Sequence, residues 1–336
     1  MFLSVCIVYY RGTQYIDDCL ETLGRALKDL EWELLLFDNE DTKESRETIE
    51  YAIAKTNIPN CRIVAESKNI GFGPANNRLA EIASGSHLFL LNQDTRIEAF
   101  EIPGSSSLKE DTIYVPLLFN EDRTRQQNEF HYPTKIKVFS QMSTTAESFL
   151  RRVIQITRRR FVARSPYLGN ETYPSGAALL VPARIFEAAG GFDEYLFMYH
   201  EECDFFSRIR KEKKVVVSEY EKIRITHFGN SGRPVRPRLQ AESFCNLAYI
   251  LGKERKNFNI ACRLIKLYIY KIKVDKVVSG TIMRKNKKAR TTFIYNNNNW
   301  PEARIPPDVF YSEMLEHLRK KLELLEKMQQ PRFNHS

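Results

Sequence analysis

The first 97 residues alternate between short apolar runs and segments of helical periodicity. Four runs rich in apolar and β-branched residues predict strands, at residues 2–10, 32–38, 60–66 and 87–94. Between them, apolar residues recur at helical spacing in three segments, at residues 13–30, 41–56 and 73–85, the last ending at a C-terminal glycine, Gly85. Strands that alternate with helices form a parallel sheet covered by helices on both faces, so the pattern predicts an α/β fold.

Polar residues follow the second and fourth predicted strands at the point where each ends. In such sheets the ligand binds beyond the carboxyl ends of the strands, so we expect Asp38 and Asp94 at the same edge. The fourth strand runs directly into Asn92, Gln93 and Asp94. A carboxylate placed there can hold Mg²⁺ or Mn²⁺, with substrate phosphates completing the coordination. A plain turn after a buried strand is the alternative.

A glycine-containing loop, "NIGFGPANN", precedes the third predicted helix. Gly71 and Gly73 allow the backbone to approach a ligand closely, and a helix N-terminus favours an anion. The third glycine of the dinucleotide-binding fingerprint is missing. The loop is therefore either a phosphate-binding segment or a simple helix-capping loop.

An acidic cluster lies in "MYHEECDFFSRI", where Glu201, Glu202 and Asp204 fall within four residues. Crowded carboxylates raise the pKa of at least one member unless a cation compensates, and a raised pKa suits a general base. The alternative is an acidic first turn that complements the helix dipole, with Arg208 as a helix-spaced partner. His227 ends another predicted strand and is either structural or a ligand of metal or phosphate.

The remaining elements between residues 98 and 235 are fewer. Strands are expected at residues 112–119, 177–181, 215–217 and 223–227, and a short helix at residues 183–189. A Gly-Gly turn separates this helix from the acidic cluster.

The order of these motifs resembles a known family. The pieces are "LSVCIVYYRG", "LFDNEDTKES", "NIGFGPANN", "LLNQDTRI", "SGA", "GGFDEYLFMYHEECD" and "HFGNS". They resemble the inverting glycosyltransferases of family 2, which have the GT-A fold, including bacterial rhamnosyltransferases of polysaccharide synthesis. The resemblance covers about residues 1–235 and implies a Rossmann-like mixed sheet flanked by helices. It implies a nucleotide-binding half at about residues 1–97 and an acceptor half at residues 98–235, followed by a helical, basic C-terminal region at residues 236–336.

The resemblance also implies roles for individual residues. The residues expected to bind the donor are Asp38, Asn39, Asn69, Gly71, Asn77 and Asn92. Those expected to bind the divalent metal are Asp94 and His227. Those expected on the acceptor side are Gly191, Phe192 and Asp193. The catalytic base matches Glu202, while Glu201 and Asp204 remain open alternatives. The chain departs from the family pattern at Asn92, where an aspartate is usual, and at Glu202, which is one methylene longer than the usual aspartate.

The implied activity is sugar transfer from a nucleotide-diphosphate donor, either dTDP-rhamnose or a UDP-sugar. One in-line displacement would invert the anomeric centre, and the acceptor would be a glycan or a polyprenyl-linked glycan. Two other classes stay open: a non-catalytic nucleotide-sugar-binding protein, and a nucleic-acid-binding protein suggested by the net charge of +9 and by "RRVIQITRRRF". The second does not explain the acidic and glycine motifs, so no nucleic-acid partner is expected.

The C-terminal region combines helical periodicity with basic charge. Residues 239–270 are periodic, residues 271–290 are strongly basic, and a last helix is expected over residues 308–329. The composition fits an anionic membrane surface, or a helical subdomain that packs its apolar residues internally. In the last helix apolar residues repeat at heptad-like spacing, which suggests a homodimer: Tyr311, Leu315, Leu318, Leu322 and Leu325.

The six cysteines are scattered without a CxxC pair, which favours a reducing, cytoplasmic setting over a zinc site or a disulfide framework. No apolar run is long enough to cross a membrane. The expected location is therefore the cytoplasm, with peripheral attachment at the inner face of the membrane.

Overall fold

The computed structural model divides the chain into two compact units. The first comprises residues 1–132 and 164–229, and the second residues 133–163 and 230–336. The structure describes residues 2–56, 58, 60–102, 108–133, 171–210, 215–229, 237–285 and 307–329. The basic segment "RRVIQITRRRF" lies outside the described residues, as does the stretch 286–300.

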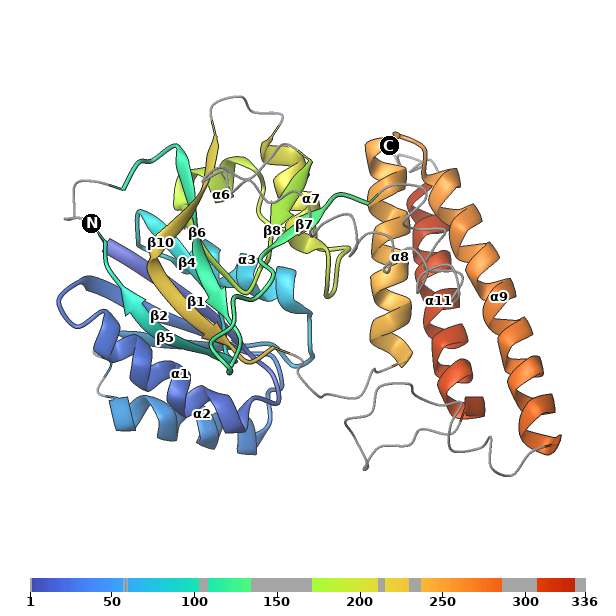
Figure 1. The fold of residues 1–336 in the computed structure, drawn as a ribbon, viewed down its shortest axis with the longest axis horizontal. Coiled ribbons are helices and arrows are strands. Elements are labelled where there is room, and N and C mark those ends of the chain that lie inside the picture. The colour runs from blue at the N-terminus through green and yellow to red at the C-terminus, as the bar shows by residue number, and fades with distance from the viewer. Residues whose placement is uncertain are drawn as a thin grey trace, which may run out of the picture. The chain divides into compact units, whose positions relative to one another are not determined.

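The first unit is built on an eight-stranded sheet (Figure 1). In spatial order the strands are β3 (Cys61–Ala65), β2 (Glu31–Asp38), β1 (Phe2–Tyr9), β4 (His87–Asn92), β9 (Ala178–Pro182), β6 (Thr112–Phe119), β10 (Val216–His227) and β5 (Thr95–Phe100). A separate pair is formed by β7 (Glu129–His131) and β8 (Thr172–Pro174). The expected α/β fold with a mixed sheet flanked by helices is confirmed.

The direction of the strands brings several carboxyl ends to one edge. β3, β2, β1 and β4 are parallel, as the alternating pattern predicts. β9 is antiparallel to both β4 and β6, while β10 runs parallel to β6. β10 therefore points the same way as β4. Because β5 continues directly from β4 and pairs His227 with Thr95, the sheet curls and brings the end of β10 beside the end of β4.

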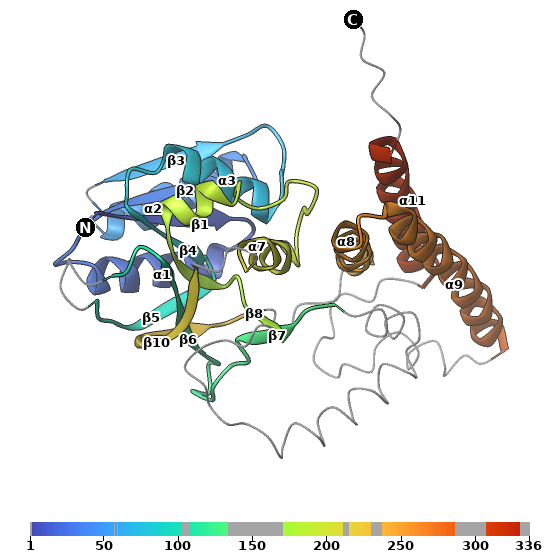
Figure 2. The same ribbon diagram turned by 90° about the horizontal axis from the view of Figure 1, so that it is seen from above.

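Helices cover both faces of this sheet (Figures 1 and 2). On one face lie α1 (Thr13–Ala26) and α2 (Lys43–Thr56), which pack against each other. The other face carries α3 (Phe72–Ile82). Two shorter helices follow later in the chain, α6 (Ala183–Ala188) and α7 (Glu201–Ile209). In α1 the residues Ile16, Leu20 and Leu23 are fully buried at helical spacing, so a single apolar stripe docks this helix on the sheet.

Two local expectations are wrong. The separate strands at residues 215–217 and 223–227 are one twelve-residue strand, β10, whose pairing with β6 shifts register between Tyr220 and Arg224. Gly85 is not a helix C-cap, because α3 ends at Ile82 and Ala83 is already extended. Gly85 instead allows close packing on β1: a Cβ at this position would lie 2.5 Å from the backbone nitrogen of Ser4.

The described residues of the second unit form three long helices, which confirms the expected helical C-terminal region. They are α8 (Pro237–Glu254), α9 (Phe258–Lys285) and α11 (Pro307–Gln329), each in contact with the other two. The heptad-like stripe of α11 is turned inward, with Leu315, Leu318 and Leu325 buried. The stripe that suggested a homodimer is thus used inside the unit. Among the described residues, none of the helices is apolar enough over sufficient length to cross a membrane.

An ionic cluster fixes α11 against α8. Glu242 is almost completely buried, and its carboxylate lies 2.5 Å from His317 Nε2 and 2.7 Å from Lys321 Nζ. Burial pushes the pKa of Glu242 upward, but the hydrogen bonds and charges of His317 and Lys321 outweigh it and hold the pKa below its usual range. Since an unpaired carboxylate would be costly here, the cluster specifies how the two helices align.

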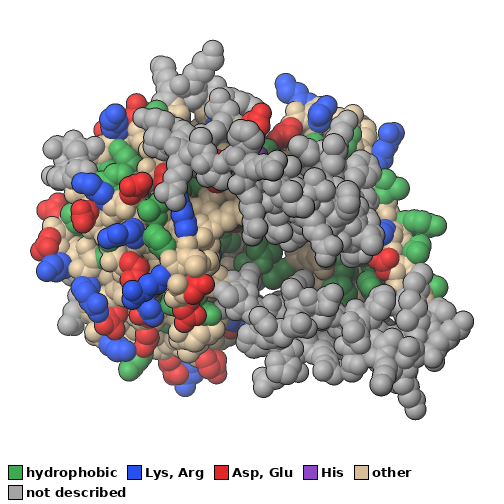
Figure 3. All heavy atoms as spheres, viewed as in Figure 1, with side chains coloured by type: hydrophobic (Ala, Val, Ile, Leu, Met, Phe, Trp, Pro, Cys, Tyr) green, Lys and Arg blue, Asp and Glu red, His purple; other side chains and the backbone are tan. Residues whose placement is uncertain are grey.

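One face of α9 remains exposed. Figure 3 shows apolar and basic side chains together on the flank of the helical unit. The apolar members are Leu267, Tyr270, Val274 and Val277, with exposed fractions of 51%, 70%, 43% and 69%.

Candidate functional site

The end of β4 and the end of β10 form a polar lip at one edge of the sheet. Asn92 Nδ2 lies 3.4 Å from His227 Nε2, and Asp94 Oδ1 lies 3.5 Å from the same ring nitrogen. The structure thus brings His227 together with Asn92 and Asp94, which lie 135 and 133 positions earlier in the chain. The pairing of His227 with Thr95 in the curled sheet is what places them side by side.

Gln93, between Asn92 and Asp94, has a different task. Its side-chain oxygen accepts a hydrogen bond from the backbone N–H of Tyr10 at 3.0 Å, and its amide nitrogen donates to the Tyr10 carbonyl at 2.7 Å. Any Cβ at Gly12 would collide with the Gln93 amide at 2.3 Å. Gln93 therefore fastens the loop after β1 to the lip, a role that the sequence pattern did not reveal.

The lip offers a partial coordination set for a cation. The described residues contain no cluster of three or more His, Cys, Asp or Glu side chains suited to a metal ion. Asp94 and His227 nevertheless supply a carboxylate and an imidazole, and Asn92 Oδ1 is buried without a hydrogen-bond partner among the described residues. Mg²⁺ and Mn²⁺ are commonly held by one or two carboxylates together with substrate phosphates and water. The residues therefore fit a cation that a diphosphate helps to hold.

Asp38 and Asn39, at the end of β2, are buried and bonded to backbone or neighbouring side chains. The Asp38 carboxylate accepts hydrogen bonds from the N–H groups of Glu40 and Asp41 and from the Ser45 hydroxyl, which organises the turn into α2. Asn39 accepts from the Ile70 N–H at 2.9 Å and donates to the Gly71 carbonyl at 3.0 Å. The two residues thus organise the turn into α2 and the glycine loop at this edge of the sheet.

The glycine loop is docked against the segment before α7. Asn69 accepts a hydrogen bond from the Gly71 N–H, and Gly71 has φ +100°. A Cβ at Gly71 would lie 2.2 Å from the Phe197 carbonyl oxygen, to which the Phe72 N–H donates at 2.8 Å. Only glycine tolerates both this backbone conformation and this close approach.

Asn77 joins the helix that follows the glycine loop to the turn around Gly191 and Phe192. Its amide nitrogen donates to the Phe192 carbonyl at 2.9 Å, and its amide oxygen accepts from the Phe192 N–H at 2.8 Å. Gly191 has φ +65°, and a Cβ there would meet Asn77 Oδ1 at 2.5 Å. Asp193 then accepts from the Tyr195 N–H and tightens the same turn. The segment that follows the glycine loop and the turn around Gly191 and Phe192 therefore pack directly against each other.

The acidic cluster opens α7, and its three carboxylates lie in different surroundings. Asp204 is buried and bound to Arg208 at 2.8 Å, the helix-spaced partner expected of a structural residue. Glu201 is buried as well. Glu202 is partly exposed, yet one of its oxygens is buried without a hydrogen-bond partner among the described residues. Burial raises the pKa of Glu202 to about 7, and backbone N–H groups reduce this effect only in part.

The backbone before Glu202 is unusual. Tyr199 and His200 both have φ 70°, in the left-handed region that residues other than glycine seldom adopt. Two such residues in succession set the direction in which α7 begins. Strain of this kind persists where the surrounding structure enforces it, often at functional sites.

The start of β9 connects the lip to Glu202. The Asn92 N–H donates to the Ala177 carbonyl at 2.9 Å. A Cβ built at the preceding residue, Gly176, would lie 3.9 Å from Glu202 Cδ and 3.9 Å from Phe72 at the start of α3. The "SGA" motif therefore lies between the polar lip, the acidic cluster and the helix that follows the glycine loop.

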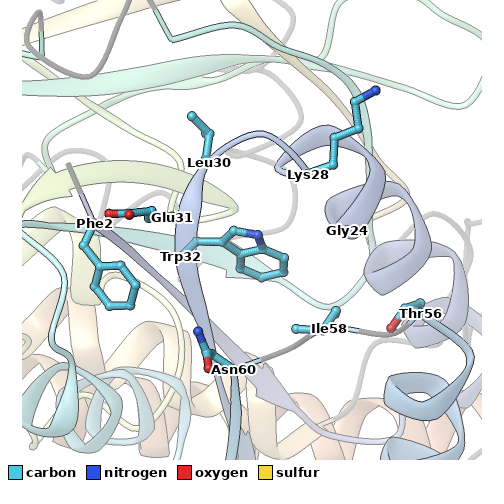
Figure 4. A pocket seen from close by; sticks show the side chains of 9 residues that line it. All are labelled: Phe2, Gly24, Lys28, Leu30, Glu31, Trp32, Thr56, Ile58 and Asn60. Carbon is cyan, nitrogen blue, oxygen red and sulfur yellow. The ribbon is translucent and has the colours of Figure 1, made fainter.

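A pocket of about 580 Å³ lies elsewhere (Figure 4). Phe2, Glu31, Trp32 and Asn60 line it, and they mark the amino ends of β1 and β2 and the approach to β3. Ligands of parallel sheets bind at the opposite, carboxyl edge. The lip and Glu202 lie at that carboxyl edge or are connected to it, so this pocket is separate from the candidate site.

Comparison with known proteins finds a family match for the first part of the chain. Residues 4–102 match the family described as Glycosyl transferase family 2. The matched segment carries Asp38, Asn77, Asn92 and Asp94 and ends before Glu202. A search of curated proteins finds no match.

The solved structures that match this chain are distant from it. One is GalNAc-T7 with UDP, GalNAc and Mn²⁺, with 15% identity, 74% of this chain and 48% of that chain covered, and a TM-score of 0.49. Another is S. aureus TarS 1-349, with 14% identity, 99% and 93% covered, and a TM-score of 0.44. A third is the mannosyltransferase PcManGT from Pyrobaculum calidifontis in complex with GDP-Man and Mn²⁺, with 10% identity, 98% and 88% covered, and a TM-score of 0.47. This chain thus spans about half the length of the first of these proteins.

Proposed function

We propose that this chain transfers a sugar from a nucleotide-diphosphate donor to a hydroxyl group of a glycan or lipid-linked glycan, with inversion. The observation that carries the proposal is Glu202: a partly exposed carboxyl whose pKa is about 7, adjoining the "SGA" segment that also bonds to the polar lip. A group of this kind can accept a proton at neutral pH. The family match over residues 4–102 supports a donor site at the same edge.

The mechanism assigns one step to Glu202. Its carboxylate takes the proton of the acceptor hydroxyl, the acceptor oxygen forms a bond to the anomeric carbon, and the bond to the nucleoside diphosphate breaks in the same displacement. Separate attacking and leaving sides give inversion. Asp94 and His227, with Asn92 beside them, would hold the divalent cation, which when bound offsets the negative charge of the leaving diphosphate.

The other predicted site residues act by positioning. Asn39, Asn69 and Gly71 hold the glycine loop at the edge of the sheet, and Asn77 holds the turn of Gly191 and Phe192. We place Asp204 outside the chemistry, because Arg208 already neutralises it. The donor is either dTDP-rhamnose or a UDP-sugar, and polysaccharide synthesis at the inner face of the membrane is the proposed setting.

An assay of nucleoside diphosphate release tests this function against a non-catalytic binding role. The protein is incubated with dTDP-rhamnose or with UDP-sugars, with Mg²⁺ or Mn²⁺, and the free nucleoside diphosphate is measured. We expect release from one class of donor, dependent on the cation and lost in Asp94→Ala. Tight binding of a donor without release, even with glycan acceptors present, would favour a nucleotide-sugar-binding protein.

We further propose that the exposed face of α9 contacts an anionic membrane surface, where a lipid-linked acceptor would be met. The face carries four exposed apolar residues and the exposed cations Arg263 and Lys273. Asp275 is the one acidic residue in the α9 sequence, and it pairs with Lys271. Two copies of so basic a face would repel each other, so a lipid surface suits it better than a second copy of the chain.

A further inference from the structure

A chain of side-chain hydrogen bonds leads from the turn after β6 to His227. The Thr124 hydroxyl donates to the Asp122 carboxylate at 2.5 Å. The Asn120 amide nitrogen donates to the Thr124 oxygen at 2.9 Å, and the Gln126 amide nitrogen donates to the Asn120 oxygen at 3.0 Å. Gln126 Oε1 then lies 2.8 Å from His227 Nδ1.

The direction of every bond in this chain follows from its first member. An ionised carboxylate only accepts hydrogen bonds, so the single hydroxyl hydrogen of Thr124 points to Asp122. The Thr124 oxygen must then accept from the nitrogen of the Asn120 amide. That leaves the Asn120 oxygen to accept from Gln126, which turns the Gln126 oxygen toward the imidazole.

A second contact fixes the Gln126 amide in the same orientation. Its nitrogen also donates to the backbone carbonyl of His227 at 3.2 Å, and its backbone N–H donates to the Leu118 carbonyl at 2.8 Å. A reversed amide would place its oxygen against two other oxygens. Gln126 Oε1 can only accept, so Nδ1 of His227 must carry the hydrogen.

We propose that Gln126, supported by Asn120 and Thr124, is a positioning residue that holds His227 as the Nδ1–H tautomer and presents the Nε2 lone pair to the polar lip. Nε2 is the ring nitrogen nearest Asp94 and Asn92. A lone pair there can bind a divalent cation, and hydrogen bonds of this kind from the far side of the ring orient histidine ligands. The tautomer of His227 follows from the hydrogen-bond geometry alone, whereas cation binding by Nε2 rests on the proposed function.

Nitrogen NMR of the imidazole rings tests the tautomer without metal or substrate. The full chain is labelled with ¹⁵N-histidine and measured at about pH 8, where free imidazole is neutral. Of its six histidines, His227 is assigned by the signal lost in His227→Asn. We expect a protonated Nδ1 and an unprotonated Nε2 in the native chain, and a shift toward the Nε2–H form in Gln126→Leu and Thr124→Val.

Two variants act as controls for this experiment. Thr124→Ser keeps the hydroxyl and should restore the native tautomer. Gln127→Leu changes the neighbouring glutamine, which donates instead to the Glu129 carbonyl, and should leave His227 unchanged. An Nε2–H tautomer in the native chain, or an unchanged tautomer in Gln126→Leu, would overturn the inference.

Binding of Mn²⁺ alone, followed by electron paramagnetic resonance, separates this inference from the proposed function. We expect Gln126→Leu to bind Mn²⁺ about 10-fold to 100-fold more weakly than the native chain, and Gln127→Leu to bind it normally. If the tautomer changes while Mn²⁺ affinity does not, the hydrogen-bond chain stands and cation binding by Nε2 of His227 is refuted.

Discussion

At the scale of single residues, Glu202 carries the strongest prediction. We expect Glu202→Gln to lower turnover by about 10²-fold to 10⁴-fold with donor binding retained, because the amide cannot accept the acceptor proton. In the native chain turnover should rise as pH increases through about 7, where the carboxyl ionises. A pH profile of turnover for the two proteins checks this. Near-normal turnover in Glu202→Gln, with loss in Glu201→Gln, would move the base to Glu201.

Glu202 should lower the free energy of unfolding of the native chain above neutral pH. Burial raises the pKa of Glu202 from about 4.5 to about 7, so between these values the folded chain binds more protons than the unfolded chain. The free energy of unfolding therefore falls as pH rises through this window. Glu202→Gln removes the cost, so at about pH 8 the variant should melt at a higher temperature than the native chain, while at about pH 4 the two should be alike. Equal melting temperatures at both pH values would contradict a raised pKa of Glu202.

The sequence indicated the polar residues that lie at the ends of strands, as with Asn92, Asp94 and His227. It did not indicate the hydrogen-bond partners of the amide side chains. Asn77 was expected to face the donor, but its hydrogen bonds go to Phe192, 115 positions away. Gln126 gave no signal at all, because a lone glutamine in a turn has no periodicity or motif and its role depends on a histidine 101 positions later.

At the scale of secondary-structure elements, the parallel strands and their helices followed from hydrophobic periodicity alone. The antiparallel strands could not be predicted from this periodicity. β5 begins three residues after β4 ends, and its pairing with β10 depends on the curl of the sheet. The break in β10 looked like a gap between two strands because polar residues interrupt the apolar pattern where the register shifts.

The α9 face gives a prediction at this scale. The double variant Leu267→Ser and Val277→Ser should reduce partitioning onto phosphatidylglycerol vesicles by at least about tenfold, because two apolar side chains no longer enter the interface. Co-sedimentation measures the bound fraction. Binding should also weaken at high salt and on phosphatidylcholine vesicles.

A matched control lies on α11. Leu324 and Met328 are exposed to a similar extent, 51% and 53%, and their replacement by serine should leave vesicle binding unchanged. Equal loss in both double variants would show that the attachment is not specific to α9. Self-association of the native chain that disappears in the α9 variant would assign this face to a second copy instead.

At the scale of the whole molecule, the sequence predicted a change of character near residue 235, where the glycosyltransferase resemblance ends and helical periodicity begins. The helical region exists, and its last helix packs internally through the stripe that had suggested a dimer. Burial of that stripe depends on α8 and α9, whose contact with α11 no local pattern reveals. The first unit by itself holds every residue of the proposed donor and base sites.

We expect the carboxyl edge of this unit to bind a nucleotide-diphosphate sugar together with a divalent cation. The melting temperature of the full chain with dTDP-rhamnose, UDP-sugars or GDP-mannose, each with and without Mn²⁺, measures this binding. A donor at about 100 times its dissociation constant stabilises the folded state by about 2.7 kcal/mol, which corresponds to a rise of about 5–10 °C. We predict such a rise for one class of donor, dependent on Mn²⁺ and absent in Asp94→Asn. No rise with any donor, or an equal rise in Asp94→Asn, would contradict the account.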